Sequence, residues 1–410
     1  MPGPLKKDTA AAAASLAQTA ARAFQPRQEF PDYRVVLAQL KGHQTKALHR
    51  MAQLAPQINL VVELRDARAP LATANVLLDK VFKGKDKLIV YTKKDMSPVS
   101  SQLLQRWHAP RNEKWLAIDS RKNRDVALVL RALREKHRSM LPPPPLGLRL
   151  MVAGMPNVGK STLVNELRRH GLAAGGGGGA AGGDERRFRK VARTGNMAGV
   201  TRNTSEIIRI SAEPEMLLYD TPGVLLPQVD SVRTMLALYL AGTVSASSSS
   251  DGGIDPVIAT DYLLYMMNLA DPSGAGYRRY LPHPTNDVYE LLDGVGRLTG
   301  NRNRRKIDGG KLRTNYVGCA LELVKEFQQG RLGRWCLDEA VVRQLSPDAF
   351  SEQAAAERRR VDSHPSRLGK TLDPDAAATA TDASAAAAKT TKAARRRERL
   401  VKQSNQLFTV

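Results

Sequence analysis

One stretch of the chain has the composition of a phosphate-binding loop. Gly154–Ser161 reads GMPNVGKS and fits G-x-x-x-x-G-K-[ST], with an apolar run before it and a helical pattern after it. Its glycines allow backbone N–H groups to turn toward a β-phosphate, and the following helix adds the positive end of its dipole. Lys160 is expected to contact phosphate oxygens and Ser161 to ligate Mg²⁺. The residues expected at the nucleotide are Asn157, Val158, Gly159, Lys160, Ser161 and Thr162.

Two segments downstream have residue types that respond to a γ-phosphate. Asp220-Thr221-Pro222-Gly223 ends an apolar run, where Asp220 can hold Mg²⁺ through water and the Gly223 amide can face the phosphate. A switch loop also needs a Thr that closes over Mg²⁺ and the γ-phosphate. Thr201 is our candidate for that nucleotide and metal contact, and Thr204 is the alternative.

A second set of residues could recognise a base. Thr92, Lys93, Lys94 and Asp95 follow an apolar run, and Asp119 and Ser120 follow the next one. Guanine presents N1–H and N2–H₂ donors along one edge, so the Asp95 carboxylate can accept both, whereas adenine offers no such pair. We expect Lys93 to lie over the ring and the Asp119-Ser120 backbone to reach guanine O6. Thr92 replaces the usual Asn, so a P-loop ATPase stays open as an alternative.

Alternating strands and helices must place these loops at one edge of a sheet. Buried or apolar runs predict strands, and their segments are Ile58–Leu64, Leu88–Tyr91, Trp115–Ile118, Leu148–Ala153, Glu206–Ile210 and Met216–Tyr219. Helical patterns lie between them, which predicts an α/β fold with a parallel, doubly wound sheet. After Pro256 the pattern predicts helices only, over Pro256–Leu269, Asn286–Leu298 and Thr314–Gln328.

Composition narrows the partners and the compartment. The 410 residues carry 63 Lys and Arg against 40 Asp and Glu, a formal charge of +23, which favours nucleic acid or an anionic membrane over a merely solvated basic surface. No apolar run approaches the ~20 residues of a membrane span. Cys319 and Cys336 have no metal-type spacing, and Cys319 is expected to be buried in a helix. Residues 1–27 have the composition of either a mitochondrial transit peptide or a disordered tail.

The order of these motifs resembles that of a known family. The base-recognition residues precede the phosphate loop, as in the circularly permuted GTPases of the YlqF/RbgA type, and the similarity is strongest to their mitochondrial branch. It extends over roughly residues 33–339 and includes Leu64–Pro70, Gly294–Gly310 and Gly330–Gly333. The resemblance implies hydrolysis of GTP to GDP with Mg²⁺, coupled to assembly of the mitochondrial large ribosomal subunit through its rRNA. It also implies a matrix location peripheral to the inner membrane.

The resemblance also suggests how hydrolysis is catalysed. The family lacks a glutamine after Asp-x-x-Gly, and here Val224 and Leu225 cannot orient a water. A histidine in an N-terminal Gly-His segment is the proposed substitute, and it corresponds to His43, although His43 could instead only pack in its helix. Asn157 matches the position where related GTPases hold K⁺.

The predicted organisation has five parts. They are a presequence at 1–27, a permuted GTPase domain at 33–243 with a flexible insertion at 172–187, a Ser/Gly linker at 244–253, a helical RNA-binding domain at 254–345, and a basic, disordered tail at 352–410. The main alternative function is a non-catalytic tether of RNA or membrane that GTP switches.

Overall fold

A computed structural model of the chain describes residues 24–33, 42–173, 207–220, 231–244, 254–304 and 312–343, and residues 355 and 359. Several predicted features lie outside these residues. They are Thr201, Thr204, Gly223, residues 174–187 of the predicted insertion, most of the presequence, most of the linker and nearly all of the basic tail. The backbones of His43 and Asp220 are described, and their side chains are not.

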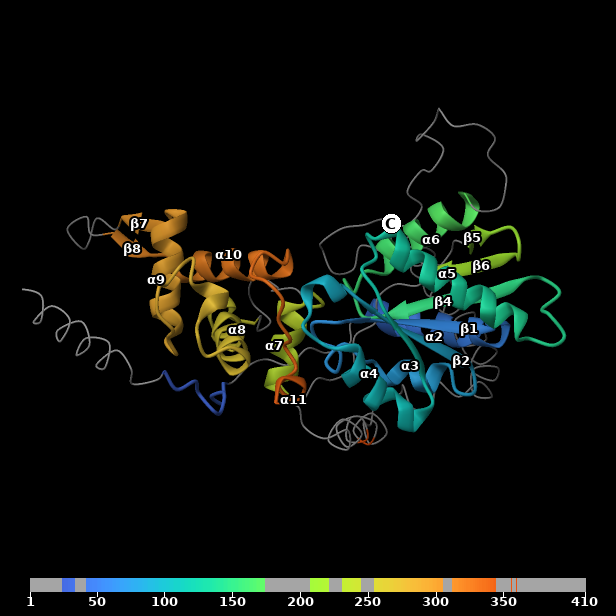
Figure 1. The fold of residues 1–410 in the computed structure, drawn as a ribbon, viewed down its shortest axis with the longest axis horizontal. Helices are drawn as coiled ribbons and strands as arrows, with labels where there is room; N and C mark the ends of the chain where they lie inside the picture. The colour runs from blue at the N-terminus through green and yellow to red at the C-terminus, as the bar shows by residue number, and fades with distance from the viewer. Residues whose placement is uncertain are drawn as a thin grey trace, which may run out of the picture.

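A six-stranded sheet forms the centre of the first part, with strand order β3-β2-β1-β4-β6-β5 (Figure 1). The strands are β1 (Leu60–Asp66), β2 (Asp86–Thr92), β3 (Lys114–Ala117), β4 (Leu148–Gly154), β5 (Ile207–Ser211) and β6 (Met216–Asp220). The order confirms the doubly wound α/β fold. The prediction of a parallel sheet was wrong at one edge, because β5 runs antiparallel to β6. Only residues 212–215 join these two strands, and that is too short for a parallel crossover.

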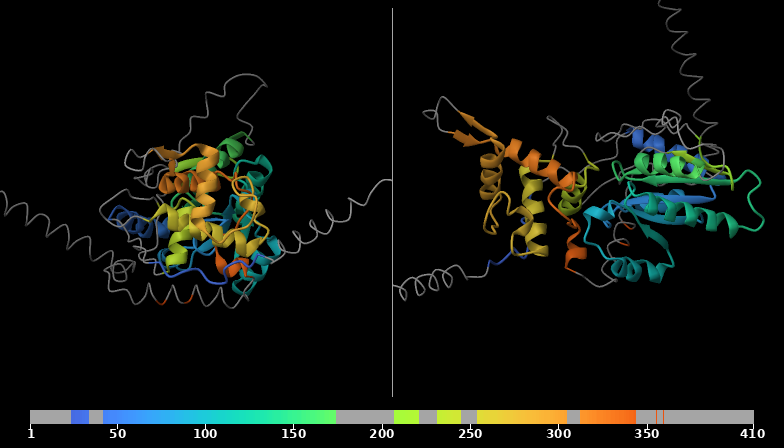
Figure 2. Two further views of the ribbon diagram at one scale, coloured as in Figure 1. Left: turned by 90° about the vertical axis from the view of Figure 1, so that its left-hand side faces the viewer. Right: turned by 45° about the horizontal axis from the view of Figure 1, so that its top comes forward.

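Helices cover both faces of this sheet. They are α2 (Gly42–Leu54), α3 (Val76–Val81), α4 (Ser101–His108), α5 (Asn123–Arg138) and α6 (Lys160–Ala173), with short 3₁₀ turns η1 (Ala55–Gln57), η2 (Lys94–Met96) and η3 (Ala109–Arg111). Alternate side chains of a strand point to opposite faces. Leu60, Val62 and Leu64 therefore pack in the cluster of α5 and α6, whereas Val61 packs in that of α2 and α3. Figure 2 shows the two helical layers from a further side.

The helices that position the site follow from local sequence. In α5, Val126, Val129, Leu130 and Leu133 recur at helical spacing and are buried, while the opposite side of the helix is charged. The helix α6 begins at Lys160, within the phosphate-loop motif, and ends at Ala173. The first two residues of the predicted insertion at 172–187 are therefore helical.

A helical part follows the sheet. It contains α7 (Val232–Leu240), α8 (Pro256–Ala270), η5 (Ala275–Tyr277), α9 (Val288–Thr299), α10 (Tyr316–Gln328) and α11 (Glu339–Val342). The helix α7 lies before the predicted linker at 244–253, yet it packs on α8 and α10. Cys319 is buried in α10, as predicted.

The expectation of helices alone after Pro256 was wrong. Strands β7 (Arg302–Arg304) and β8 (Leu312–Thr314) pair in antiparallel fashion, with Arg302 opposite Thr314. These strands are only three residues long and mostly polar, so no alternating apolar pattern marks them in the sequence.

Residues 24–33 pack along α8. Phe30 is buried beside Tyr262, with ring centroids 5.1 Å apart, and the Tyr33 hydroxyl donates to Asp261 at 2.9 Å. Arg27 forms an ion pair with Asp261 at 2.5 Å. The last residue of the predicted presequence therefore contacts the helical part. Among the described helices, none has both the length and the apolar character needed to cross a membrane.

Candidate nucleotide-binding site

The carboxyl ends of five neighbouring strands meet at one edge of the sheet. The parallel register places Leu64 of β1 beside Gly154 of β4, and Asp66 beside Thr92 of β2. At the same edge, Val152 of β4 lies beside Asp220 of β6. This edge is where open α/β sheets bind their ligands. The phosphate loop, the base-recognition residues and the Asp220 backbone are thus brought together despite their separation in the sequence.

The phosphate loop has the backbone conformation that its sequence predicts. Gly154 and Gly159 have φ values of +147° and +99°, which are strained for residues with side chains. A Cβ atom at Gly154 would lie 2.5 Å from the carbonyl oxygen of Leu64, so the close approach of β1 requires glycine there. Lys160 is buried and its Nζ donates to the carbonyl oxygen of Met155 at 2.7 Å, which holds the ammonium over the loop.

Thr92 connects the base-recognition residues to the phosphate loop. Its hydroxyl donates to the carbonyl oxygen of Val158 at 2.5 Å and lies 3.2 Å from that of Arg65. Thr92 is buried. The hydroxyl therefore joins the two loops across the strand end, although the side chain is shorter than the asparagine expected at this position.

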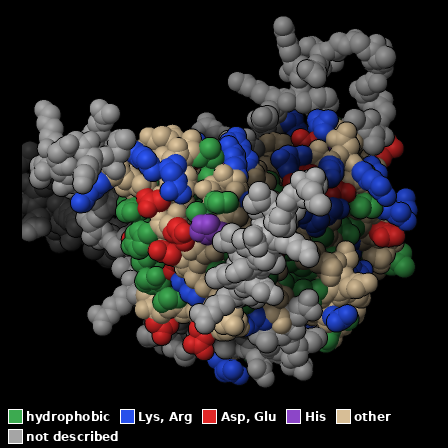
Figure 3. Space-filling model, turned by 60° about the vertical axis from the view of Figure 1, so that its left-hand side comes forward, with side chains coloured by type: hydrophobic (Ala, Val, Ile, Leu, Met, Phe, Trp, Pro, Cys, Tyr) green, Lys and Arg blue, Asp and Glu red, His purple; other side chains and the backbone are tan. Residues whose placement is uncertain are grey.

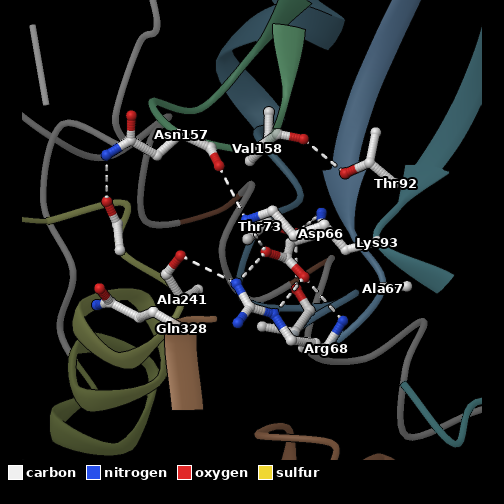
Figure 4. Close-up of polar contacts among 12 residues, drawn as sticks. Asp66, Ala67, Arg68, Thr73, Thr92, Lys93, Asn157, Val158, Ala241 and Gln328 are labelled. Atoms are coloured by element: carbon white, nitrogen blue, oxygen red, sulfur yellow. Dashed lines mark hydrogen bonds and ion pairs between the residues drawn. The ribbon is translucent and has the colours of Figure 1, made fainter. Parts of the chain in front are cut away.

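Lys93 lies between the phosphate loop and the buried ion pair of Asp66 and Arg68 (Figure 4). Its Nζ contacts Asp66 Oδ2 at 2.8 Å and donates to the carbonyl oxygen of Asn157 at 3.0 Å. Burial lowers the pKa of the Lys93 ammonium, and Asp66 offsets part of that shift. Burial alone would raise the pKa of the Asp66 carboxyl, but the charges of Arg68 and Lys93 hold it well below its usual range. Asp66 is therefore ionised near neutral pH and fixes the position of the Lys93 side chain.

Asp95 has one oxygen engaged and one without a partner. Arg121 donates to Oδ2 at 2.5 Å, whereas the buried Oδ1 accepts no hydrogen bond. The hydroxyl of Ser120 is also buried and has no hydrogen-bond partner. The unpartnered Asp95 oxygen can accept hydrogen bonds from the N–H donors on the edge of guanine, and the Ser120 hydroxyl can donate one to guanine O6. The Arg121 side chain is 64% exposed, so it can leave Oδ2 for a ligand at little cost.

Asp125, in the first turn of α5, organises the second base-recognition segment. Its Oδ2 accepts from the Asp119 amide at 2.8 Å and from Lys94 Nζ at 2.9 Å. The Asp119 amide is therefore already hydrogen-bonded, so it is poorly placed to serve guanine O6 as well. Asp119 Oδ1 accepts from the Arg121 amide at 3.0 Å, which closes a tight turn around Ser120.

The donors available to Mg²⁺ match the preference of that ion for oxygen. Ser161 stands in the first turn of α6, and Asp220 ends β6 beside β4. A hydroxyl and a carboxylate are a suitable set, because Mg²⁺ takes few protein ligands and completes its shell with water and phosphate oxygens. The described residues contain no cluster of three or more His, Cys, Asp or Glu that would hold a metal without the nucleotide.

Two predicted roles stay open at this site. The Asn157 Nδ2 donates to the carbonyl oxygen of Gly242 at 2.7 Å, so this residue contacts the segment after α7, and its role in holding K⁺ stays a prediction. His43 lies in the first turn of α2. That helix is anchored by Leu48 and Met51, which pack in the cluster that contains Val61 and Met151.

Sequence reasoning missed three residues of the site. Asp66 and Arg68 fall in the stretch that resembles the family, but nothing in the pattern indicates that they pair with Lys93. An acidic residue such as Asp125 is common at the start of a helix. Only the folded structure shows that it accepts a hydrogen bond from the Asp119 amide. The useful signal for Asp66 was its place at the end of a buried strand beside the phosphate loop.

Comparisons with known proteins agree with this geometry. A family model described as "50S ribosome-binding GTPase" matches residues 149–251. The chain is 40% identical to "Mitochondrial GTPase 1" of Saccharomyces cerevisiae, over 66% of this chain and 75% of that protein. It is 30% identical to "Mitochondrial GTPase 1" of Schizosaccharomyces pombe, over 81% of this chain and 98% of that protein.

More distant similarities reach bacteria. The chain is 27% identical to "Ribosome biogenesis GTPase A" of Bacillus cereus, over 78% of this chain and 97% of that protein. Among solved structures, it is similar to GNP-bound YlqF from T. maritima, with 21% identity and a TM-score of 0.47, over 72% of this chain and 97% of that one.

Proposed function

The chain belongs to the YlqF/RbgA-type family of circularly permuted GTPases, in its mitochondrial GTPase 1 branch, and we propose that it acts in assembly of the mitochondrial large ribosomal subunit. In this proposal the GTP-bound protein binds rRNA of the subunit, and hydrolysis of GTP to GDP releases it. The observation that carries the proposal is the convergence of the phosphate loop, Thr92 and Asp95 at one sheet edge in a chain whose matching family model is described as ribosome-binding.

In the proposed mechanism, each loop acts on one part of GTP. The amides of Gly154–Ser161 and the ammonium of Lys160 bind the phosphates, and Asp95 accepts two hydrogen bonds from guanine. Lys93, held by Asp66, covers the ring. Ser161 and Asp220 would hold Mg²⁺, which neutralises charge on the β- and γ-phosphates when bound. Thr201 and Gly223 would contact the γ-phosphate, so that hydrolysis changes the segment that leads to α7.

The proposed partner is ribosomal RNA. The formal charge of +23 suits a polyanion, whose phosphates are neutralised by Lys and Arg. On the described part of the face drawn in Figure 3, basic side chains lie in several separate places with acidic ones among them. We therefore expect RNA contacts spread over several places, with the basic residues beyond residue 343 contributing to affinity.

The proposed location is the mitochondrial matrix, peripheral to the inner membrane. The names of the yeast relatives and the basic, acid-poor composition of the N-terminal residues support the mitochondrial part of this proposal. If a presequence is removed, we place the cut before Arg27. Arg27 and Phe30 pack on α8, so a later cut would strip the helical part of a buried aromatic ring and an ion pair.

His43 is the proposed residue that orients the attacking water. A single-turnover assay with purified mitochondrial large subunits tests both this role and the enzymatic nature of the protein. Wild type should hydrolyse GTP slowly alone and at least about tenfold faster with subunits, and His43→Ala should lose that stimulation, since a positioned catalytic group contributes roughly 10²–10⁴-fold. Nucleotide affinity should stay unchanged.

The matched control is His49→Ala, on the same helix α2. This variant should retain stimulation, because it removes a histidine of the helix without touching residue 43. If subunits stimulate neither wild type nor His49→Ala, the proposal of a subunit-dependent GTPase is wrong. If His43→Ala is stimulated as well as wild type, another residue orients the water.

A further inference from the structure

We propose that Arg68 is a positioning residue through which the helical part of the molecule sets how tightly the site binds guanine nucleotides. The inference rests on the proposed guanine site, in which Lys93 covers the ring, and adds a control of that site. Figure 4 labels Asp66, Arg68, Lys93 and Ala241, which are among the residues that carry it.

The Arg68 guanidinium fixes the orientation of the Asp66 carboxylate. Its Nε donates to Oδ1 at 3.1 Å and its Nη2 donates to Oδ2 at 2.8 Å. The Arg68 amide donates to the same Oδ1 at 2.9 Å. Both side chains are 1% exposed. A two-pronged pair of this kind fixes the plane of the carboxylate as well as its distance. Asp66 therefore presents Oδ2 to Lys93 in one direction.

The same guanidinium contacts two helices of the helical part. Nη2 donates to the carbonyl oxygen of Ala241, just after α7, at 3.2 Å, and Nη1 reaches that of Phe327, near the end of α10, at 3.5 Å. The guanidinium carbon also lies 5.2 Å from the centre of the Phe327 ring. Carbonyls at helix carboxyl ends carry partial negative charge, so a buried cation stabilises both ends at once. The Phe327 carbonyl oxygen also accepts from the Gly330 amide at 2.9 Å.

A continuous chain of contacts therefore runs from the helical part to Lys93. It passes from Ala241 and Phe327 through Arg68 and Asp66 to the Lys93 ammonium, 2.8 Å from Asp66 Oδ2. Water and salt screen buried charges little, so a displacement at one end changes the energy at the other. Because coupling between two equilibria is reciprocal, docking of the helical part strengthens guanine binding, and guanine binding strengthens docking.

A second contact also connects the nucleotide site to the segment after α7. Asn157 of the phosphate loop donates to the carbonyl oxygen of Gly242, the residue after Ala241. The two carbonyls that come after α7 are thus each held by a different loop of the nucleotide site. The helix α7 is also the next described element after the strand that ends at Asp220. The start of α7 is therefore joined to the nucleotide site by the polypeptide backbone, and the residues after its end are joined to the site by the side chains of Arg68 and Asn157.

The test measures fluorescent GDP binding to the full chain, with affinity and the number of sites determined separately. Arg68→Gln should raise Kd about tenfold, which corresponds to loss of about one charge-assisted hydrogen bond. The value of kcat at saturating GTP should change by a smaller factor than Kd does, since Arg68 acts through Asp66 and Lys93 and touches no reacting atom. The Kd of Arg68→Lys, which keeps the charge but not the planar fork of donors, should lie between those of wild type and Arg68→Gln.

Phe327→Leu tests the coupling from the helical side, far from the nucleotide loops. It should raise Kd about threefold in the wild-type background and cause no further rise in Arg68→Gln, because both changes break one chain of contacts. The control is Gln328→Ala. Gln328 is the next residue and donates to the carbonyl oxygen of Tyr239 at 3.3 Å. Its side chain takes no part in the series of contacts that runs from the helical part to Lys93, so truncating it to alanine should leave Kd unchanged.

Two results would overturn the inference. One is a loss of binding sites in Arg68→Gln with unchanged Kd in the remaining sites, which is the result of a purely structural role. The other is an unchanged Kd in Phe327→Leu, which stays informative even if Arg68→Gln does not fold. Asp95→Asn separates this failure from a wrong guanine site. If the guanine site is right, that variant loses its preference for GTP over ATP whatever the Arg68 variants do.

Discussion

At the scale of single residues, Thr92 shows how one hydroxyl can take over a structural task. The motif usually begins with asparagine, and the sequence alone left open whether threonine spoils the loop. The structure places the Thr92 hydroxyl 2.5 Å from the carbonyl oxygen of Val158, in the phosphate loop. The side chain is buried, so water cannot easily replace this bond.

Thr92→Val tests this task, because valine has nearly the same shape and lacks the hydroxyl. We expect Kd for GDP to rise about fivefold to tenfold, since a buried hydrogen bond contributes about 1 kcal/mol. Thr92→Ser keeps the hydroxyl and should bind within about twofold of wild type. Titration with fluorescent GDP gives these values. Equal affinity of the valine variant and wild type would mean that the hydroxyl does not join the loops in solution.

The sequence predicted the loops better than their contacts. The glycine spacing, Lys160 and the residues from Thr92 to Asp95 follow from local patterns that recur wherever phosphates or guanine are bound. The partners of Arg68 could not be predicted in the same way. They lie 173 and 259 positions away, and only the docking of α7 and α10 brings them to Asp66. The engagement of the Asp119 amide by Asp125 likewise depends on how α5 begins.

At the scale of elements, the central strand β1 contains a buried charge network. Glu63 is fully buried, with Arg65 at 2.7 Å and Lys87 of β2 at 3.0 Å. Burial alone would raise the pKa of the Glu63 carboxyl, but these two cations lower it from 4.5 to about 2. A carboxyl with a lowered pKa in the folded state stabilises the fold above pH 4.5. That contribution is lost as the pH falls toward 2.

Glu63→Gln should therefore alter the pH dependence of stability. Near pH 7 the free energy of unfolding should fall by about 3 kcal/mol, since one pKa unit corresponds to about 1.4 kcal/mol. Between pH 4.5 and pH 2 the variant should lose less stability than wild type does. Chemical denaturation at several pH values measures both effects. The control is Glu135→Gln, at an exposed position of α5, which should behave as wild type does. If the free energy of unfolding of wild type and of Glu63→Gln changed in parallel with pH, Glu63 would not be the source of the pH dependence.

The elements themselves were largely predictable where an apolar pattern was strong. The central strands and α8, α9 and α10 occur within a few residues of their predicted places. The direction of β5 was not predictable from its apolar residues, because either direction buries the same side chains. The β7 and β8 pair escaped prediction because its residues are mostly polar and pair through the backbone.

At the scale of the whole molecule, the permuted order of the strands does not disturb the nucleotide site. The phosphate-loop strand β4 stands between β1 and β6, so the base-recognition loops lie on one side of it and Asp220 on the other. The permutation instead determines which element each loop leads to. The chain that leaves Asp220 leads to α7, and α7 ends against Arg68 and Asn157. The nucleotide site and the helical part are therefore joined by the polypeptide backbone and by side-chain contacts.

We propose that GTP binding commits this protein to the large ribosomal subunit and that hydrolysis releases it. The test is co-sedimentation of the full chain with mitochondrial ribosomal particles, with a non-hydrolysable GTP analogue compared with GDP. Lys160→Ala is the control, because it weakens phosphate binding. Wild type should sediment with large-subunit particles in the analogue and remain in the supernatant with GDP, and Lys160→Ala should remain in the supernatant with both nucleotides. Equal sedimentation of wild type with the analogue and with GDP, or none with either, would show that the bound nucleotide does not control binding to the subunit.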